Sequence, residues 1–240
     1  MVRPLVNRFK DANAVASQAA ADLYAFVESK LAIQERVDVA VTGGTVGIAT
    51  LAAARDLAFN SLDLSRLHIW WGDERFVQTD SSERNANQAR NAWLKDLQIP
   101  IENIHEFPAS NQGYTLDEAA AEFTSHYDAA AINFDLMLMG MGPDGHIASL
   151  FPGKTAGDSP ASIVAEHESP KAPPLRLSFN YEQINNAKEI WFTVAGSDKA
   201  EAVLTVFGDT PSSLPAGRIS GKEKTVWYVD QTAGNLVWGC

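Results

Sequence analysis

The amino-acid sequence predicts an α/β fold: a single Rossmann-like domain with a mainly parallel sheet flanked by helices on both faces. Two patterns lead to this prediction. Short apolar runs that suit buried strands alternate with segments in which apolar residues recur every three or four positions, the spacing of one helical face. Several strands end in glycine-containing turns that lead into a helix, and this repeat places successive strands parallel through right-handed crossovers.

The predicted elements follow one another along most of the chain. Short apolar or β-branched runs predict strands at residues 37–41, 67–71, 136–139, 163–165, 175–179, 190–195 and 225–229. Helical apolar spacing predicts helices at residues 11–34, 48–58, 86–97, 116–127 and 199–207, with a further short helix opening at 144–147. The loops at 153–160 and 169–174 are too short to separate two domains, so we expect residues 1–240 to form one.

Composition and charge exclude several classes of protein. The net charge of -11 and the sequence pI of about 4.8 argue against binding to nucleic acid or to an anionic membrane, both of which need a basic surface. An anionic substrate would therefore need a local cluster of Arg and Lys. The one cysteine, Cys240, cannot form an internal disulfide, and the five His show no zinc-like spacing, so we expect no metal. No signal peptide or membrane span is recognisable, and we expect a cytoplasmic protein.

Four of the predicted strands end in polar, glycine-containing turns. These turns read TGGT at 42–45, GDER at 72–75, GMGPDGH at 140–146 and GSDK at 196–199. Because the carboxyl ends of parallel strands share one edge of a sheet, and ligands bind in the crevice at that edge, we expect the four turns to meet in one site.

Three of these turns carry groups suited to a phosphorylated sugar. Thr42, Gly43, Gly44 and Thr45 combine close backbone approach with hydroxyl donors at a helix N-terminus, although a plain tight turn explains them equally well. In the second turn Asp73 can accept hydrogen bonds from sugar hydroxyls and Arg75 can bind an anion, or the two can form a solvated ion pair. Lys199 opposes the dipole of its predicted helix unless an anion lies between them.

The third turn offers a candidate general base, His146. Next to a predicted helix N-terminus its protonated form is disfavoured, so the ring should be neutral and able to accept a proton, with the amides of Gly142–Gly145 available to an oxyanion. The alternative is a histidine that only caps the loop. Ser149 follows, but it lacks the G-x-S-x-G context of a serine nucleophile. The other histidines have no such context and are expected to be structural or exposed: His68, His105, His126 and His167.

The four motifs together resemble the 6-phosphogluconolactonase family. The resemblance rests on TGGT, WWGDERFV, GMGPDGHIASLFPG and GSDKA, in this order, and runs from about Val37 to Val229. The family belongs to a superfamily that also contains glucosamine-6-phosphate deaminases and isomerases. Those enzymes carry an Asn-Glu-Pro run after the DGHIA core, where this chain has Ser149-Leu150-Phe151-Pro152. This difference favours the lactonases.

The resemblance implies hydrolysis of 6-phospho-D-glucono-1,5-lactone to 6-phospho-D-gluconate in the oxidative pentose phosphate pathway, without metal or organic cofactor. It implies that His146 is the general base and that Lys199 binds the phosphate. The implied catalytic residues are His146 and Asp73. The implied substrate-binding residues are Thr42, Gly43, Gly44, Thr45, Arg75, Gly142, Asp144, Gly145, Arg176 and Lys199, of which Arg176 rests on a Pro-Pro-x-Arg segment.

Two other functions remain open at the level of sequence. A sugar-phosphate isomerase or deaminase acting on glucosamine 6-phosphate would use Asp73 as a base to remove a carbon-bound proton. A non-catalytic sugar-phosphate sensor would need a DNA-binding helix-turn-helix, for which the single predicted helix before Val37 leaves no room. Nothing in the sequence requires more than a monomer.

Overall fold

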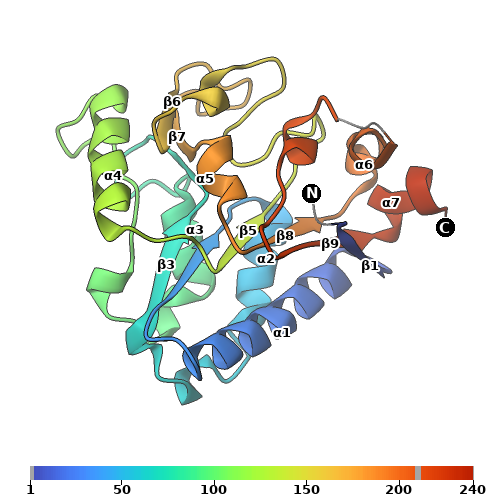
Figure 1. Cartoon of the computed structure of the whole chain (residues 1–240), viewed down its shortest axis with the longest axis horizontal. Coiled ribbons are helices and arrows are strands. Elements are labelled where there is room, and N and C mark those ends of the chain that lie inside the picture. The colour runs from blue at the N-terminus through green and yellow to red at the C-terminus, as the bar shows by residue number, and fades with distance from the viewer. Residues whose placement is uncertain (1–2, 209–211, 240) are drawn as a thin grey trace.

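A computed structural model describes residues 3–208 and 212–239 of the chain (Figure 1). Its centre is a six-stranded sheet in the order β1-β9-β8-β5-β2-β3, and every neighbouring pair of strands is parallel. The strands are β1 (Leu5–Phe9), β2 (Val37–Val41), β3 (Leu67–Trp71), β5 (Leu136–Met139), β8 (Glu189–Val194) and β9 (Lys224–Asp230). The predicted parallel α/β fold is therefore confirmed.

Helices lie on both faces of this sheet. They are α1 (Ala12–Leu31), α2 (Thr45–Ala54), α3 (Asn85–Ala92), α4 (Leu116–Ala130), α5 (Tyr181–Asn185), α6 (Ala200–Gly208) and α7 (Gln231–Trp238). Helix α1 packs through Phe26 on Trp191 of β8, whereas the next residue, Phe192, stacks on Trp227, which meets Phe207 of α6. Because successive strand residues point to opposite faces, α1 and α6 cover opposite sides of the sheet.

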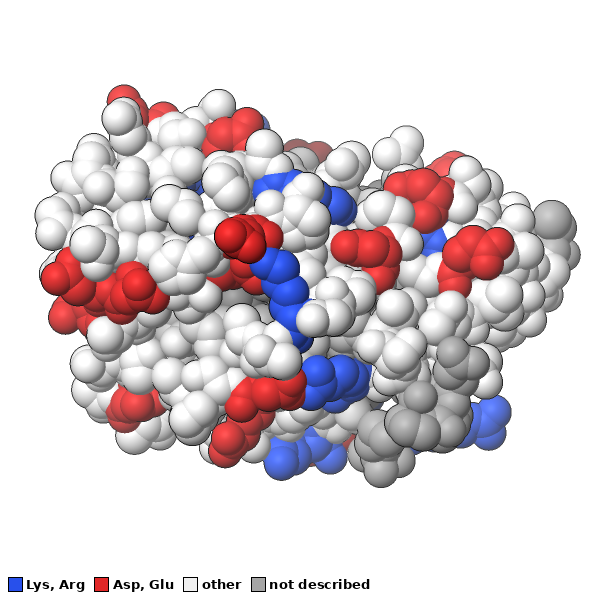
Figure 2. Space-filling model, turned by 90° about the horizontal axis from the view of Figure 1, so that it is seen from above, with Lys and Arg blue, Asp and Glu red and all other residues white. Residues whose placement is uncertain are grey.

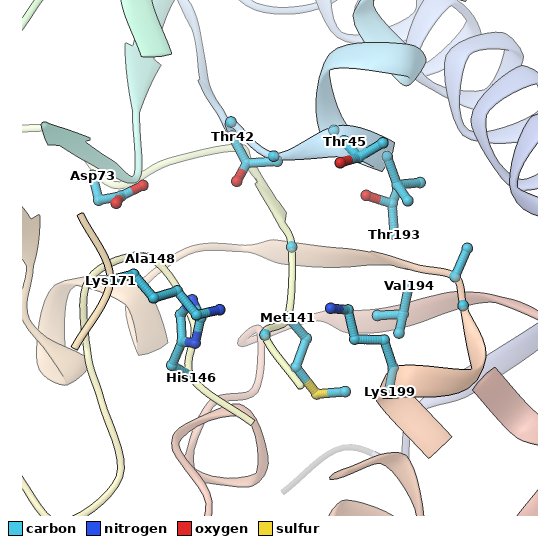
Figure 3. Close-up of a pocket in the computed structure, with 18 of the residues that line it drawn as sticks. Thr42, Thr45, Asp73, Met141, His146, Ala148, Lys171, Thr193, Val194 and Lys199 are labelled. Atoms are coloured by element: carbon cyan, nitrogen blue, oxygen red, sulfur yellow. The ribbon is translucent and has the colours of Figure 1, made fainter. Parts of the chain in front are cut away.

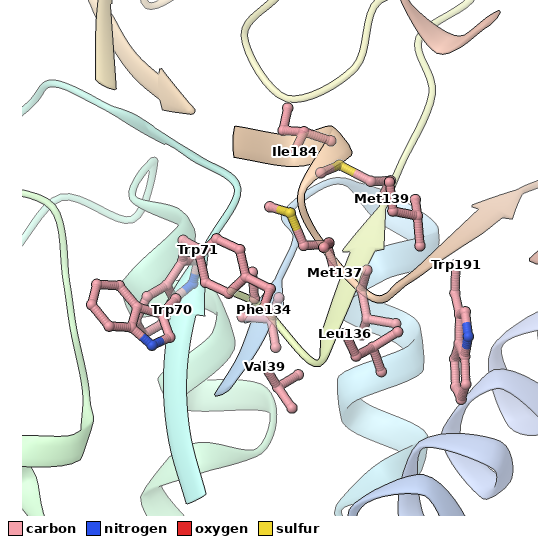
Figure 4. Packing of buried hydrophobic residues seen from close by; sticks show 14 of the residues in the cluster. Val39, Trp70, Trp71, Phe134, Leu136, Met137, Met139, Ile184 and Trp191 are labelled. Atoms are coloured by element: carbon pink, nitrogen blue, oxygen red, sulfur yellow. The ribbon is translucent and has the colours of Figure 1, made fainter. Parts of the chain in front are cut away.

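Strand β5 runs through the middle of the hydrophobic core. All four of its residues, Leu136–Met139, are buried, as expected for a strand covered on both faces (Figure 4). Trp70 and Trp71 of β3 lie in the same core. This packing holds the carboxyl end of β5, and with it the following Gly-rich segment, at a fixed place on the sheet edge.

A second, smaller sheet was not expected from the sequence. It has the order β4-β7-β6 and is antiparallel, with strands β4 (Asp73–Arg75), β6 (Ile163–Glu166) and β7 (Arg176–Phe179). The predicted GDER turn is thus a short strand that leaves the main sheet directly after β3. The sequence gives little sign of it, because three polar residues form a strand only when a partner strand supplies the hydrogen bonds.

Other local predictions were wrong or incomplete. No helix opens at 144–147: Gly145 and Ala148 both have positive φ, 78° and 46°, and two left-handed residues so close together cannot continue a right-handed helix. Strand β1 and helices α5 and α7 were not predicted. The predicted helices at 48–58 and 86–97 end earlier, at Ala54 and Ala92.

Candidate active site

A cavity of about 530 Å³ lies where the strand-end turns meet (Figure 3). Most of the predicted site residues line it: Thr42, Gly43, Gly44, Thr45, Asp73, Arg75, Gly142, His146, Arg176 and Lys199. Figure 3 shows Thr42 and Thr45 on one side, facing His146 and Lys199 on the other. Asp144 and Gly145 are not among the described lining residues. The predicted meeting of the four turns in one crevice is thus seen in the structure, although the roles of the residues remain predictions.

The TGGT turn brings a helix N-terminus to the cavity. Gly44 precedes α2 with a φ of 79°, a conformation that a residue with a side chain adopts only at a cost. A Cβ atom on Gly43 would lie 2.0 Å from Oδ1 of Asn85, so a side chain there would displace Asn85. Thr45, Val46 and Gly47 of the first turn of α2 line the cavity, and the free amides of a helix N-terminus favour an anion.

Asp73 is held on two sides. Its side chain lines the cavity, yet the residue is only 6% exposed. Oδ2 accepts a hydrogen bond of 2.6 Å from the Ser149 hydroxyl, and Oδ1 accepts one of 3.2 Å from Nδ2 of Asn85. Three segments that are far apart in the sequence thus meet at this carboxylate.

The neighbouring Glu74 anchors the start of α3 below the cavity. Its carboxylate accepts hydrogen bonds from the backbone amides of Arg75, Asn85 and Ala86. Burial raises the pKa of Glu74 to about 7, against the opposing effect of the buried Arg84 guanidinium and these amides. Glu74 therefore fixes the positions of two residues that line the cavity, Arg75 and Asn85.

Four cations line the cavity of this acidic protein: Arg75, Lys171, Arg176 and Lys199. Arg75 and Arg176 are direct cross-strand partners, and like charges in that position repel each other unless an anion lies between them. Burial, reinforced by the charges of Lys199 and Arg176, lowers the pKa of Lys171. Figure 2 shows Lys and Arg side chains running through the middle of one face, with Asp and Glu around them. The cations lining the cavity suit a phosphate.

His146 is paired with a carboxylate. Its Nδ1 lies 2.5 Å from Oδ1 of Asp144, and its ring packs at a tilt against Phe151. Because Nδ1 carries the proton that Asp144 accepts, Nε2 keeps a lone pair. Burial lowers the pKa of His146, and Asp144 opposes this shift. The lowered pKa favours the neutral ring. The predicted cause, a helix N-terminus, is wrong because no helix begins here.

Five polar or charged residues that line the cavity were not among the predicted site residues: Asn85, Lys171, Thr193, Asp198 and Asp230. Lys171 lies in the loop that was predicted only as a connection, and the sole signal was a lysine between Pro170 and Pro173. Three bonds from the Arg176 guanidinium, to the carbonyls of Lys171, Ala172 and Pro173, hold this loop over the cavity. Asn85 gave no signal at all, because its role depends on contacts with Asp73 and Gly43.

Two kinds of feature are absent from residues 3–208 and 212–239. No group of three or more His, Cys, Asp or Glu side chains is placed to hold a metal ion. Within the same ranges, no helix has both the length and the apolar character needed to span a bilayer.

Comparison with known proteins places this site in a family. A model of "Glucosamine-6-phosphate isomerases/6-phosphogluconolactonase" matches residues 10–227. A 6-phosphogluconolactonase of Mycobacterium leprae is 39% identical over 98% of each chain, and one of Streptomyces coelicolor is 35% identical over 94% of this chain and 92% of its own. The crystal structure of 6-phosphogluconolactonase from Thermotoga maritima shares the fold, with a TM-score of 0.86 at 24% identity, covering 95% of this chain and all of the other. The chain belongs to the glucosamine-6-phosphate isomerase/6-phosphogluconolactonase family.

Proposed function

We propose that this chain is an enzyme that hydrolyses 6-phospho-D-glucono-1,5-lactone to 6-phospho-D-gluconate, in the oxidative pentose phosphate pathway. The relatives that match nearly the whole chain at 35–39% identity are named 6-phosphogluconolactonases. The observation that carries the proposal is a histidine bonded to a carboxylate, in a cavity that four cations also line. A lactone is a reactive ester, so a base, a water molecule and a bound phosphate are sufficient for its hydrolysis.

In the proposed mechanism His146 acts as general base. Nε2 removes a proton from water as its oxygen attacks C1 of the lactone, and Asp144, bonded to Nδ1, stabilises the imidazolium that forms. The tetrahedral intermediate collapses with cleavage of the bond between C1 and the ring oxygen. The ring oxygen takes the proton from the imidazolium, and the new carboxylic acid releases one proton to solvent.

The proposed phosphate site consists of the cations and the amides at the start of α2. Lys199 and Lys171 supply ammonium groups, and Arg75 and Arg176 supply guanidinium groups from neighbouring strands. The ion pair between Lys199 and Asp198 (2.7 Å) and the backbone bonds of Arg176 position these groups before substrate arrives. Binding the phosphate in this way would hold C1 of the sugar close to His146.

Asp73 is proposed to bind a sugar hydroxyl. Both of its oxygens already accept a hydrogen bond, from Ser149 and Asn85. These bonds occupy a lone pair on each oxygen and fix the carboxylate in place, which disfavours the removal of a carbon-bound proton that an isomerase would require. Asp144, predicted to bind substrate, is instead proposed to orient His146.

The direct test follows acid release from freshly prepared 6-phosphogluconolactone, with the spontaneous hydrolysis rate subtracted. A rate proportional to enzyme concentration is expected. In parallel, incubation with glucosamine 6-phosphate should release no ammonia. Ammonia release without acceleration of lactone opening would show that the chain is a deaminase.

Three wider predictions concern the number of domains, the oligomeric state and the location in the cell. One domain is proposed because residues of both sheets join a single buried cluster, for example Leu138 of β5 and Leu177 of β7. A monomer acting in the cytoplasm is proposed as well. Several separate segments of this one chain supply the cavity residues, so the cavity needs no second copy of the chain. Light scattering of the purified protein and the location of a tagged chain in cells test these two points.

A further inference from the structure

The side chain of Ser149 joins two motifs that the sequence keeps far apart. The residue is fully buried, and its hydroxyl donates a 2.6 Å hydrogen bond to Oδ2 of Asp73, 76 positions earlier. Ser149 is not among the described residues that line the cavity, whereas Asp73 is. Substrate would therefore meet the carboxylate and not the serine, so Ser149 is not placed to act as a nucleophile.

The backbone around Ser149 forms a tight turn that these contacts support. Ile147 and Leu150 exchange two backbone hydrogen bonds, of 3.3 and 2.8 Å, across Ala148 and Ser149. Ala148 has a φ of 46°, a left-handed conformation that is unfavourable for a residue with a Cβ atom. The turn starts one residue after His146. Contacts that hold Ser149 in place therefore also help to fix the position of His146.

The strength of the two bonds to Asp73 differs. The hydroxyl bond from Ser149 is short and donated to a carboxylate, the class of hydrogen bond that is roughly twice as strong as a neutral one. Asn85 donates at 3.2 Å to the other carboxylate oxygen, Oδ1, and divides its Nδ2 group between Oδ1 and the Asp73 carbonyl. Asp73 is only 6% exposed, so its carboxylate depends on hydrogen bonds from the protein. Ser149 is thus the principal donor that keeps this carboxylate in its position.

We propose that Ser149 is a positioning residue that acts through Asp73: its hydroxyl holds the carboxylate in the orientation that accepts a hydroxyl of the bound sugar. This inference rests on the lactonase function proposed above. It also gives a physical meaning to the Ser-Leu-Phe-Pro run, because the first residue of that run is the donor.

A double-mutant cycle tests the inference in the full-length enzyme. Ser149→Ala, Asp73→Ala and the double variant are compared with wild type by kcat and KM for the lactone and by the Kd of 6-phosphogluconate. In the wild-type background, Ser149→Ala is expected to lower kcat/KM and product affinity by roughly 10- to 100-fold, the range for a hydrogen bond to a charged group. In the Asp73→Ala background, the same substitution should change either quantity by less than about threefold.

A matched control separates positioning from general damage. Ser162 is also buried, and its hydroxyl also donates a short hydrogen bond to a carboxylate, Oδ1 of Asp128 at 2.7 Å, but neither residue is among the described residues that line the cavity. Ser162→Ala should leave kcat/KM and product affinity within about threefold of wild type. Thermal melts of all variants show the stability changes separately from these constants.

Two results would overturn the inference. One is a Ser149→Ala enzyme with wild-type kcat/KM and product affinity. The other is an equal loss from Ser149→Ala with and without Asp73, which would mean that the serine acts on the fold or on the His146 turn. Neither result affects the proposed function, which depends on whether the wild-type enzyme accelerates lactone opening.

Discussion

Histidines line two of the cavities that the described residues form, and the two cavities differ in the groups that surround the histidine rings. The active-site cavity, of about 530 Å³, holds His146 paired with Asp144. A second cavity, of about 470 Å³, is lined by His105 and His126. There His105 bonds at Nε2 to Nδ1 of His68 (3.0 Å) and at Nδ1 to Nε2 of His126 (2.9 Å). One ring thus has a carboxylate partner, and the other has only imidazoles.

The charges around the two cavities are opposite in sign. Four cations (Arg75, Lys171, Arg176 and Lys199) and three aspartates (Asp73, Asp198 and Asp230) line the active-site cavity, an excess of one positive charge. The described lining of the second cavity holds three glutamates and neither Lys nor Arg; the glutamates are Glu102, Glu106 and Glu122. A phosphorylated sugar is therefore attracted to the first and repelled from the second.

Burial lowers the pKa of both His146 and His105, in the second case to about 3, with the neighbouring His126 and His68 adding to the effect. The ring of His105 also stacks on Trp70 at 3.8 Å. Both of its nitrogens are engaged, so it has no free lone pair for chemistry. A lowered histidine pKa is thus not by itself the sign of an active site. The carboxylate partner and the free ring nitrogen distinguish His146 from His105.

The largest effect is expected from His146→Ala, which removes the proposed base. The loss in kcat should be about 10²- to 10⁴-fold, the typical contribution of general base catalysis. His167→Ala is the matched control, because His167 also contacts an aspartate, Asp117, at 3.0 Å, but lies on the surface. Stopped-flow measurement of acid release compares the two. Wild-type activity in a folded His146→Ala enzyme would mean that another group is the base.

The next effect concerns the partner of that base. Asp144→Asn should lower kcat/KM by about 10- to 100-fold, because a charged hydrogen bond that orients the ring is lost. Since Asp144 raises the pKa of His146, its loss lowers that pKa further. The acidic limb of the pH profile of kcat/KM should therefore move to lower pH. A shift to higher pH would contradict the proposed pairing.

The cationic lining is tested by Lys199→Ala. We expect a rise in KM of about tenfold or more with a smaller change in kcat, because a charge-assisted bond to the phosphate is lost. Lys224→Ala serves as control, since Lys224 forms only a long contact of 3.9 Å with Glu189 away from the cavity. Equal KM values for wild type and Lys199→Ala would remove Lys199 from the phosphate site.

The smallest effect on catalysis is expected in the second cavity. His105→Gln should leave kcat/KM unchanged but alter acid stability. The folded pKa of His105 lies below its ordinary value, so the unfolded chain binds more protons, and stability is lost as the pH falls from about 6.5 toward 3. Urea titrations across this range measure the free energy of unfolding at each pH. Its pH dependence should correspond to about one proton fewer taken up on unfolding in the variant than in wild type. An unchanged dependence would show that His105 titrates normally.

Much of the fold could be predicted from sequence because it depends on local patterns. The apolar runs of β2, β3 and β5 appear at the predicted residues, since a buried parallel strand must be apolar on both faces. The TGGT turn was recognisable because Gly44 needs a positive φ. The convergence of the four turns followed from the parallel topology alone.

Other features depend on partners distant in the sequence, and only the tertiary structure decided them. Asp73–Arg75 is a strand because β7 lies beside it, and Asn85 belongs to the cavity because it fills the space that Gly43 leaves. The lowered pKa of His146 comes from burial and not from a helix, which the left-handed Ala148 prevents.

The sequence by itself therefore determined the kind of chemistry available at the sheet edge. The types of side chain, and the turns in which they follow each strand along the chain, are local properties. The tertiary structure decided which of these groups lie close enough to one another to act together. The pairing of Asp144 with His146, the hold of Ser149 on Asp73 and the loop that brings in Lys171 all depend on distances between folded segments. Hydrogen bonds and charge interactions act over a few ångströms, and only the packed chain sets separations of that order.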